Sequence, residues 1–272
     1  MMNKKIAFIG AGSMAEAIIS GMVRAEIVDN EKIIVTNRSN RERITRLEQR
    51  YQINSMMDKE KLTTDTDIII LATKPYDMEQ AIDSIKAYVT TDQLIISVTA
   101  GISTESIQEL FGIEIPIIRA MPNTSASIGY SATALAAGIH ASENHMKEAR
   151  VLFETIGTTE IVDESDMHIV TGISGSGPAY IYYLVEAMEA AAISSGLDRD
   201  TAKSLIAQTI LGAGEMLQQS EDTAAALREK ITSPAGTTQA GIESLKRNDF
   251  QKIIMECVQA ARDRSIELGN EK

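Results

Sequence analysis

The sequence contains no tryptophan, a single cysteine and only 4% aromatic residues in 272 positions. A single cysteine excludes a disulfide bond within the chain. The 26 lysine and arginine residues are outnumbered by 38 acidic residues and are scattered, so they form no basic stripe for a nucleic acid. We therefore interpret the net charge of −12 as a contribution to solubility and expect no nucleic-acid partner.

Long hydrophobic runs are also missing. The most apolar run extends from Pro178 to Ile193, and Glu186 and Glu189 interrupt it, so no membrane-spanning segment is expected. The first apolar strand begins almost at Met1, without a charged and then apolar leader. No signal peptide is expected, and the predicted location is cytoplasmic.

The cysteine and the histidines do not indicate a metal or nucleophilic site. Cys257 lies in an apolar helical series, so we interpret it as a buried packing residue. His140, His145 and His168 show no ligand spacing with carboxylates or with the cysteine. We interpret them as surface or interface residues, and no metal is predicted.

The most informative stretch is residues 5–15, which read as a short apolar strand, a glycine turn and the start of a helix. Gly10 allows a tight turn, Gly12 lets the backbone approach a pyrophosphate, and Ala15 lets the helix pack on the strand. The N-terminal N–H groups of the helix over 13–22 favour a phosphate at this turn. Such turns also serve plain packing, but the second strand that follows favours dinucleotide binding. The predicted cofactor-binding residues here are Gly10, Ala11, Gly12, Ser13 and Met14.

The second strand is expected over residues 32–36, and its tip is Asn37, Arg38 and Ser39. In dinucleotide folds an acid at this tip binds the ribose of NAD, whereas an arginine with small polar neighbours suits the 2′-phosphate of NADP. Thr36 stands where the acid would be expected. The tip residues therefore favour NADPH and leave NADH possible, with a solvated cation at a helix start as the alternative for Arg38.

Further strands are expected at 67–71, 94–98, 115–119, 133–136 and 159–162, and helices over 40–49, 75–88, 103–110 and 143–156. The first three of these strands are continuous apolar runs, which are typical of a parallel sheet covered on both faces. Ligands of such sheets collect at the carboxyl ends of the strands. Residues in the following loops are therefore further cofactor-binding candidates: Ala72, Thr73, Lys74, Pro75, Thr99 and Ala100.

The composition changes near residue 164, where alanine-rich helices begin, expected over 177–196, 200–219, 223–230, 236–247 and 249–268. The predicted fold class is α/β, with a Rossmann-like, mostly parallel sheet in residues 1–163 and an all-α dimerisation domain in residues 164–272. A helical half of this size has a limited interior, and several of its helices are apolar on more than one face. Part of this surface is therefore expected to be buried against a second copy of the chain.

Two segments rich in glycine and hydroxyl groups precede helices in this second half, at residues 171–180 and 232–238. Each is predicted to be a loop that ends at a helix N-terminus with free N–H donors, which suits a carboxylate. Helix capping alone would explain one such segment. The presence of two favours a binding site.

The motifs at residues 8–15, 72–75, 119–124, 171–180 and 233–238, in this order, resemble those of Δ1-pyrroline-5-carboxylate reductases over nearly the whole chain. The resemblance implies reduction of pyrroline-5-carboxylate to L-proline with NADPH or NADH, the last step of proline biosynthesis. It also implies a helical domain that forms a dimer and, in many members, a ring of dimers. In the family, the substrate lies where the nicotinamide meets the second hydroxyl-rich loop, and the threonine that corresponds to Thr238 bonds the ring nitrogen.

The residue types suit this chemistry. A protonated imine already has an electrophilic carbon, so the site must place that carbon near the nicotinamide and hold the carboxylate, without a metal or covalent nucleophile. Backbone N–H groups of Gly236, Thr237 and Thr238 are expected to hold the carboxylate, and the Thr238 hydroxyl to orient or protonate the nitrogen. Ser233 belongs to the same loop. Glu164, at the domain junction, is a further candidate for a substrate or water contact, or an acid on a solvated turn.

Three residues depart from the family pattern: Ala235 where glycine is usual, Ser125 where proline is common, and Asp58 where asparagine is frequent. Ala235 matters if its position needs a positive φ. With Ser125, it keeps open a non-catalytic NADP-binding regulator on the same scaffold. A β-hydroxyacid dehydrogenase is the other alternative, although the helix over 177–196 lacks the lysine which that class needs. Related cyclic imines also stay open as substrates.

Overall fold

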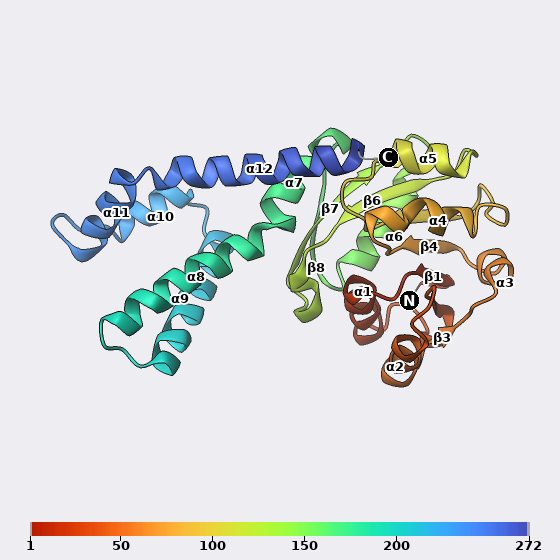
Figure 1. Ribbon diagram of the computed structural model, residues 1–272, viewed down its shortest axis with the longest axis horizontal. Helices are drawn as coiled ribbons and strands as arrows, with labels where there is room; N and C mark the ends of the chain where they lie inside the picture. Colours follow the sequence, from red (N-terminus) through yellow and green to blue (C-terminus); the bar gives the residue numbers. More distant parts are fainter. Residues whose placement is uncertain (1, 271–272) are drawn as a thin grey trace. The chain divides into compact units, whose positions relative to one another are not determined.

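The computed structural model describes residues 2–270, and in that range eight strands form one sheet (Figure 1). The strands are β1 (Ile6–Ile9), β2 (Ile33–Thr36), β3 (Asn54–Ser55), β4 (Ile68–Leu71), β5 (Leu94–Ser97), β6 (Ile117–Met121), β7 (Ser131–Ala137) and β8 (Gly157–Ile161). Their order is β3-β2-β1-β4-β5-β6-β7-β8. All neighbouring pairs are parallel except β6 and β7. The predicted Rossmann-like, mostly parallel sheet is confirmed.

The chain divides into two compact units. The first contains Met1–Pro178 and Gln259–Lys272, and the second contains Ala179–Val258. The first unit holds the whole sheet. The boundary between residues 163 and 164 stays a prediction.

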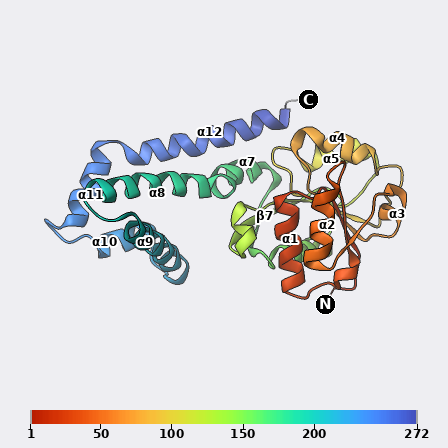
Figure 2. The same cartoon turned by 60° about the horizontal axis from the view of Figure 1, so that its bottom comes forward.

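Helices cover both faces of the sheet in the first unit (Figure 2). One face carries α1 (Ser13–Arg24), α2 (Arg41–Tyr51) and α6 (Glu143–Phe153), and the other carries α3 (Lys59–Thr64), α4 (Met78–Asp83) and α5 (Thr104–Phe111). Ile6 and Phe8 of β1 pack in the first layer, whereas Ala7 and Ile9 pack in the second. Every position of the strand is therefore apolar, as the continuous runs predict.

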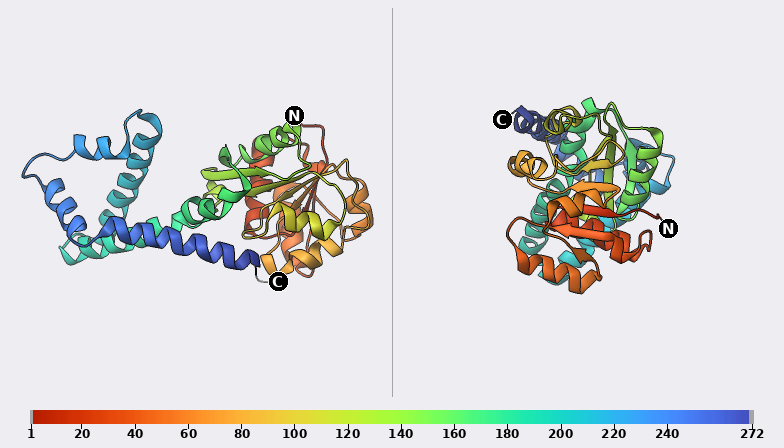
Figure 3. Two further views of the ribbon diagram at one scale, coloured as in Figure 1. Left: turned by 90° about the horizontal axis from the view of Figure 1, so that it is seen from above. Right: turned by 90° about the vertical axis from the view of Figure 1, so that its right-hand side faces the viewer.

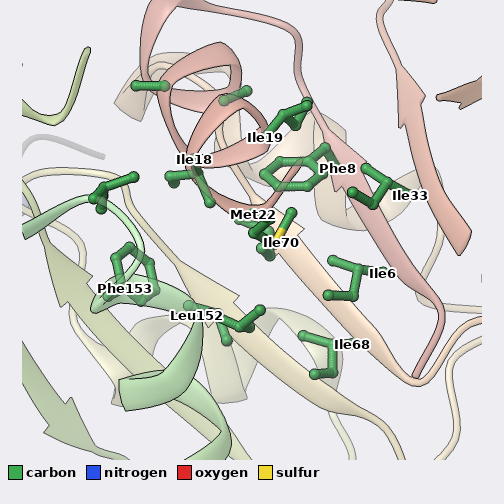
Figure 4. Close-up of a cluster of buried hydrophobic side chains, with 14 of the residues drawn as sticks. Ile6, Phe8, Ile18, Ile19, Met22, Ile33, Ile68, Ile70, Leu152 and Phe153 are labelled. Atoms are coloured by element: carbon green, nitrogen blue, oxygen red, sulfur yellow. The ribbon is translucent and has the colours of Figure 1, made fainter. Parts of the chain in front are cut away.

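The larger core lies between β1, α1 and α6. Figure 4 shows Phe8 beside Ile18 and Met22 of α1, with Phe153 of α6 in the same cluster. These four side chains are fully buried. Burial stabilises the fold by roughly 1.5–3 kcal/mol for each large apolar side chain. This packing fixes α1, and with it the glycine turn that precedes it.

The register of the central strands brings the predicted cofactor loops to one edge of the sheet. Phe8 pairs with Val35 on one side and with Ile70 on the other. The backbone N–H of Gly10 donates to the Thr36 carbonyl at 3.0 Å. The loops that follow β1, β2 and β4 therefore begin side by side.

Three sequence-based expectations differ from the structure in this unit. The pattern does not predict β3 or α3, because these elements are only two and six residues long. The helix expected over 75–88 is shorter, since a 3-10 turn, η2 (Pro75–Asp77), precedes α4, which ends at Asp83. The Ser84 hydroxyl donates to the Ala81 carbonyl at 2.7 Å, a local bond that competes with the helical ladder.

From Glu164 to Ser194 the chain is helical except at Ser176. This segment consists of η4 (Glu164–Asp166), α7 (Met167–Val170), a π-helical turn at Thr171–Gly175 and α8 (Gly177–Ser194). The loop expected before the helix that starts at 177 is therefore wrong, because residues 171–175 are helical. The Ser176 N–H donates to the Thr171 carbonyl at 2.9 Å. A Cβ on Gly175 would lie 2.8 Å from the Met121 side chain, so glycine lets this turn pack on β6.

Helices alone build the described second unit (Figure 3). They are α8, α9 (Arg199–Gln219), α10 (Ala224–Lys230), α11 (Thr237–Arg247) and the first part of α12 (Phe250–Asn270). Within residues 179–258, the buried apolar side chains are Ala202 and Ile206. Large apolar side chains of α8 and α9 are exposed instead: Tyr182, Tyr183, Leu205, Leu211, Met216 and Leu217. The unit thus presents an apolar surface that suits an interface.

The cysteine and two of the histidines have defined places. Cys257 is only half-buried in α12, so the full burial expected for it is wrong. His145 completes the capping box of α6 with Ser142. Nδ1 of His168 lies 3.0 Å from the Ser265 hydroxyl.

In residues 2–270 no helix has the length and apolar character that crossing a membrane requires.

Candidate functional site

The glycine turn between β1 and α1 has the geometry of a ligand-binding turn. Gly10 has a φ of +112°, and a Cβ at this position would lie 2.3 Å from the Ala72 carbonyl oxygen. A side chain is therefore excluded here. Gly12, the N-cap of α1, has no atom within 4 Å of the corresponding Cβ position. Open space therefore lies beside the backbone at the start of α1, as a phosphate site requires.

A cavity of about 480 Å³ opens beside this turn. This volume lies within the range of small-molecule sites. Nine of the predicted cofactor-binding residues line it: Gly10, Ala11, Gly12, Asn37, Arg38, Ser39, Ala72, Thr73 and Lys74. The structure thus brings together the loops after β1, β2 and β4.

The other five predicted cofactor-binding residues do not line the cavity. Ser13 and Met14 begin α1, and Pro75 begins η2. Thr99 is buried, and its hydroxyl donates to the Thr73 carbonyl at 3.1 Å. Ala100 packs beside the small apolar cluster around Met167. Thr99 thus supports the loop after β4, and contact of these five residues with a cofactor stays a prediction.

Sequence reasoning missed the side of the cavity formed by α3, η2 and α4. The additional lining residues there are Lys59, Tyr76, Asp77, Gln80, Ala81 and Ser84. Arg38 reaches this side, since its Nη1 donates to the Gln80 side chain at 2.6 Å and lies 3.3 Å from the Asp77 carboxylate. The proline at the first position of η2 could have indicated that Tyr76 and Asp77 turn back beside the loop after β4. No sequence pattern placed Lys59 at the cavity, because α3 was not predicted.

A charged cluster fastens the glycine turn to α2. Arg43 donates through Nε to the Ala11 carbonyl at 2.9 Å and through Nη2 to the Glu16 carboxylate. Arg50 and the Tyr51 hydroxyl both lie 3.1 Å from the same carboxylate. Burial alone would raise the pKa of Glu16, but the hydrogen bonds from Arg43 and Tyr51 and the charges of Arg43 and Arg50 outweigh it. The pKa of Glu16 is therefore held below its ordinary value of 4.5.

This cluster predicts a pH-dependent stability. Because the folded pKa of Glu16 is lowered, its contribution is present above about pH 4.5 and is lost as the pH falls through the folded pKa. At pH 7 we expect Glu16→Gln to lower the free energy of unfolding by about 1–2 kcal/mol. Denaturant titration at several pH values measures this, and the difference from wild type should narrow in acid. Glu42→Gln, at an exposed carboxylate, is the control, and parallel pH profiles would contradict the prediction.

The second candidate site is the turn between α10 and α11 in the second unit. Gly236 is the N-cap of α11, and its N–H donates to the Ser233 carbonyl at 3.0 Å. Thr237 is exposed and Thr238 is half-buried, and the N–H groups of such first-turn residues have no acceptor inside the helix. The glycine turn at residues 10–14 belongs to the other unit. A meeting of the two sites therefore stays a prediction.

Ala235 adopts the backbone conformation that makes its departure from glycine matter. Its φ is +57°, in the left-handed region. Its N–H donates to the Gln239 side chain at 2.7 Å, which closes the turn before α11. A residue with a Cβ costs roughly 1 kcal/mol more than glycine in this conformation. The turn is thus formed by alanine at an energetic cost.

Ala235→Gly should therefore stabilise the protein by up to about 1 kcal/mol, and turnover should change by less than about threefold. Thermal unfolding at a fixed protein concentration measures the first effect. Ala240→Gly provides the matched control inside α11, where glycine should cost about 1 kcal/mol. A loss of stability in Ala235→Gly like that of the control would show that the left-handed conformation carries no strain.

The other two departures have local explanations. The Ser125 N–H donates to the Asn123 side chain at 3.0 Å, a bond that proline cannot make. Asp58 is the N-cap of α3 and accepts from the Lys61 N–H at 3.1 Å, which asparagine would do equally. Neither residue lines the cavity beside the glycine turn.

Glu164 lies in the first unit, against a buried arginine of β6. The Arg119 side chain is 1% exposed, and its Nη1 donates to the Glu164 carboxylate at 2.6 Å. Nearby, burial lowers the pKa of His168, the charge of Arg119 lowers it further, and the charge of Glu164 raises it. Glu164 is therefore bound to the sheet, and its contact with a substrate or water stays a prediction.

Comparisons with known proteins agree along the whole chain. The family model described as pyrroline-5-carboxylate reductase dimerisation matches residues 164–268, and the one described as NADP oxidoreductase coenzyme F420-dependent matches residues 5–101. Pyrroline-5-carboxylate reductase 2 of Bacillus subtilis is 49% identical over 265 residues, which cover 97% of this chain and 95% of that protein. Pyrroline-5-carboxylate reductase of Staphylococcus saprophyticus is 36% identical over 267 residues, 98% of each chain.

Solved structures give the same result. A pyrroline-5-carboxylate reductase from Coxiella burnetii has a TM-score of 0.91 and 32% identity, covering 98% of this chain and 99% of that one. The pyrroline carboxylate reductase of Plasmodium falciparum, solved with NADP bound, has a TM-score of 0.89 and 32% identity, covering 99% of each chain.

Proposed function

The chain belongs to the pyrroline-5-carboxylate reductase family, and we propose that it reduces L-1-pyrroline-5-carboxylate to L-proline, the final step of proline biosynthesis. It is an oxidoreductase that acts on a C=N bond with NADPH or NADH. The observation that carries this function is the 49% identity to a named reductase over 97% of the chain. The glycine turn and its cavity provide the fold's cofactor site within the same chain.

The residues around the cavity fit a dinucleotide. The steric exclusion at Gly10 and the open space at Gly12 would let a pyrophosphate lie against the backbone at the start of α1. Asn37, Arg38 and Ser39 would hold the adenosine ribose. The loop at 72–75 would border the other end. When bound, the nicotinamide supplies the hydride.

The turn before α11 would hold the substrate. The N–H groups of Thr237 and Thr238 point to carboxylate binding, because the first N–H groups of a helix lack internal acceptors and the helix dipole favours an anion there. The predicted contact from Gly236 would require its N–H to leave the Ser233 carbonyl. Ser233 would border the same anion. The Thr238 hydroxyl would orient the ring by accepting a hydrogen bond from the N–H of the protonated imine, or would donate its proton to the unprotonated imine nitrogen. In either case the carbon of the C=N bond receives the hydride and the nitrogen carries a proton in the product. Glu164 is a further candidate for a substrate or water contact.

Self-association is part of this function. Residues 164–268 match the family's dimerisation region, and the exposed apolar side chains of α8 and α9 supply a surface that association would cover. A ring of dimers, a cytoplasmic location and the absence of a nucleic-acid partner belong to the proposal. Light scattering with size-exclusion chromatography at micromolar concentration tests the assembly, and a monomer would contradict it.

A spectrophotometric assay of NADPH and NADH oxidation with pyrroline-5-carboxylate tests the proposal. Turnover that yields proline is the expected result with at least one cofactor. Cofactor binding without turnover would instead support a regulator built on the same scaffold.

A further inference from the structure

A lysine on α3 reaches the cavity from the element that sequence patterns missed. Lys59 is the first residue of α3, and its Nζ donates to the Thr36 hydroxyl at 2.8 Å. Thr36 is fully buried and ends β2. The ammonium group therefore lies at the carboxyl end of β2, where dinucleotide folds read the adenosine ribose.

This ammonium has no recorded counter-charge within residues 2–270. Its one recorded hydrogen bond goes to the neutral Thr36 hydroxyl. The adjacent Asp58 caps α3 by accepting from the Lys61 N–H. Burial lowers the pKa of Lys59, which reflects the cost of a half-buried charge that forms no ion pair with a carboxylate of the described residues. An anion in the cavity would offset that cost.

The other cations of the cavity are already engaged. Arg38 pairs with the Asp77 carboxylate at 3.3 Å. Lys74 lies over the Tyr76 ring, with Nζ 5.6 Å from the ring centre. The tip of β2, residues 36–39, carries no acid that would repel a phosphate. Lys59 is thus the cavity cation, among the described residues, that is best placed to gain from an added anion.

We propose that Lys59 selects NADPH over NADH by binding the 2′-phosphate of the adenosine ribose with its ammonium group. Thr36 orients that group, and Arg38, which lines the same cavity, supplies a second cation. NADH carries a hydroxyl at this point, so it leaves the Lys59 charge uncompensated. The inference rests on the proposed function only in taking a nicotinamide dinucleotide as the cofactor.

Calorimetric titration of Lys59→Gln with 2′,5′-ADP, 5′-ADP, NADPH and NADH tests the proposal. Loss of one charged hydrogen bond should raise the Kd for 2′,5′-ADP and NADPH by roughly 10- to 100-fold. The Kd for 5′-ADP and NADH should stay within about twofold, because neither has the phosphate. Lys61→Gln, at an exposed lysine two residues further along α3, is the matched control and should bind all four compounds as wild type does.

Equal weakening of all four compounds, or unchanged binding of 2′,5′-ADP, would overturn the proposal. Lys59→Arg keeps a cation and should retain the preference for 2′,5′-ADP over 5′-ADP, and thermal unfolding of each variant separates a folding defect from a binding defect. Added salt should weaken 2′,5′-ADP binding to wild type more than to Lys59→Gln. Wild type that binds 2′,5′-ADP but does not turn over pyrroline-5-carboxylate would contradict the proposed function while leaving this inference intact.

Discussion

Thr238→Ala should reduce the turnover of pyrroline-5-carboxylate by roughly ten- to a thousandfold while NADPH still binds. Thr238 is the second residue of α11, two positions after the N-cap Gly236. Its backbone N–H is unaffected by the substitution, so carboxylate binding should persist. Only the hydroxyl group that orients or protonates the ring nitrogen is lost, and hence kcat should fall more than the affinity for substrate.

Steady-state kinetics with pyrroline-5-carboxylate, together with NADPH titration of each variant, provide the measurement. Thr238→Ser keeps a hydroxyl group and should recover most of the turnover, whereas Thr238→Val keeps the shape of the side chain and should not. Wild-type kcat in Thr238→Ala would remove this residue from the mechanism. A fall in NADPH affinity of the same size as the fall in kcat would assign Thr238 to cofactor binding instead.

Much of the first unit could be predicted because its strands are buried on both faces. Continuous apolar runs such as 68–71 identify central parallel strands, and the glycine turn after β1 follows from the two glycines at 10 and 12. The carboxyl ends of neighbouring parallel strands lie at one edge of the sheet. This rule was enough to predict that the ligand-binding loops gather at that edge. The cavity at that edge is lined by nine of the fourteen residues which that reasoning selected for the cofactor.

The features that escaped prediction are short or depend on packing. β3 and α3 are too short to show a hydrophobic periodicity. No sequence pattern therefore indicated that Lys59 of α3 lines the cavity. The glycines and hydroxyl groups at 171–177 suggested a loop, yet residues 171–175 form a π-helical turn, in which a Cβ on Gly175 would lie 2.8 Å from the end of the Met121 side chain. The left-handed backbone at Ala235 could not be predicted, because an alanine in a sequence gives no indication of its φ. The sequence showed only that alanine would matter if this position had a positive φ.

Glu164→Ala should lower the free energy of unfolding by about 3–5 kcal/mol, because it removes the acceptor of a buried guanidinium. Arg119 is 1% exposed, and the structure records no partner among the described residues for its Nε and Nη2 atoms. The variant would therefore leave a charge in the interior without its paired carboxylate. Thermal unfolding at fixed protein concentration should show a fall in Tm of roughly 10 °C. Asp166→Ala, at an exposed acid in the same 3-10 turn, is the control and should have little effect.

The combined variant Arg119→Met with Glu164→Leu separates the cost of an unpaired charge from the net worth of the pair. Removing both charges should recover most of the stability lost in Glu164→Ala, since a buried ion pair is worth little relative to apolar side chains of similar volume. In Glu164→Ala the pKa of His168 should also fall further, because the carboxylate that raises it is gone while Arg119 still lowers it. An unchanged Tm in Glu164→Ala with a raised KM for pyrroline-5-carboxylate would instead assign Glu164 to the substrate, and the Arg119 pair would then contribute little to the fold.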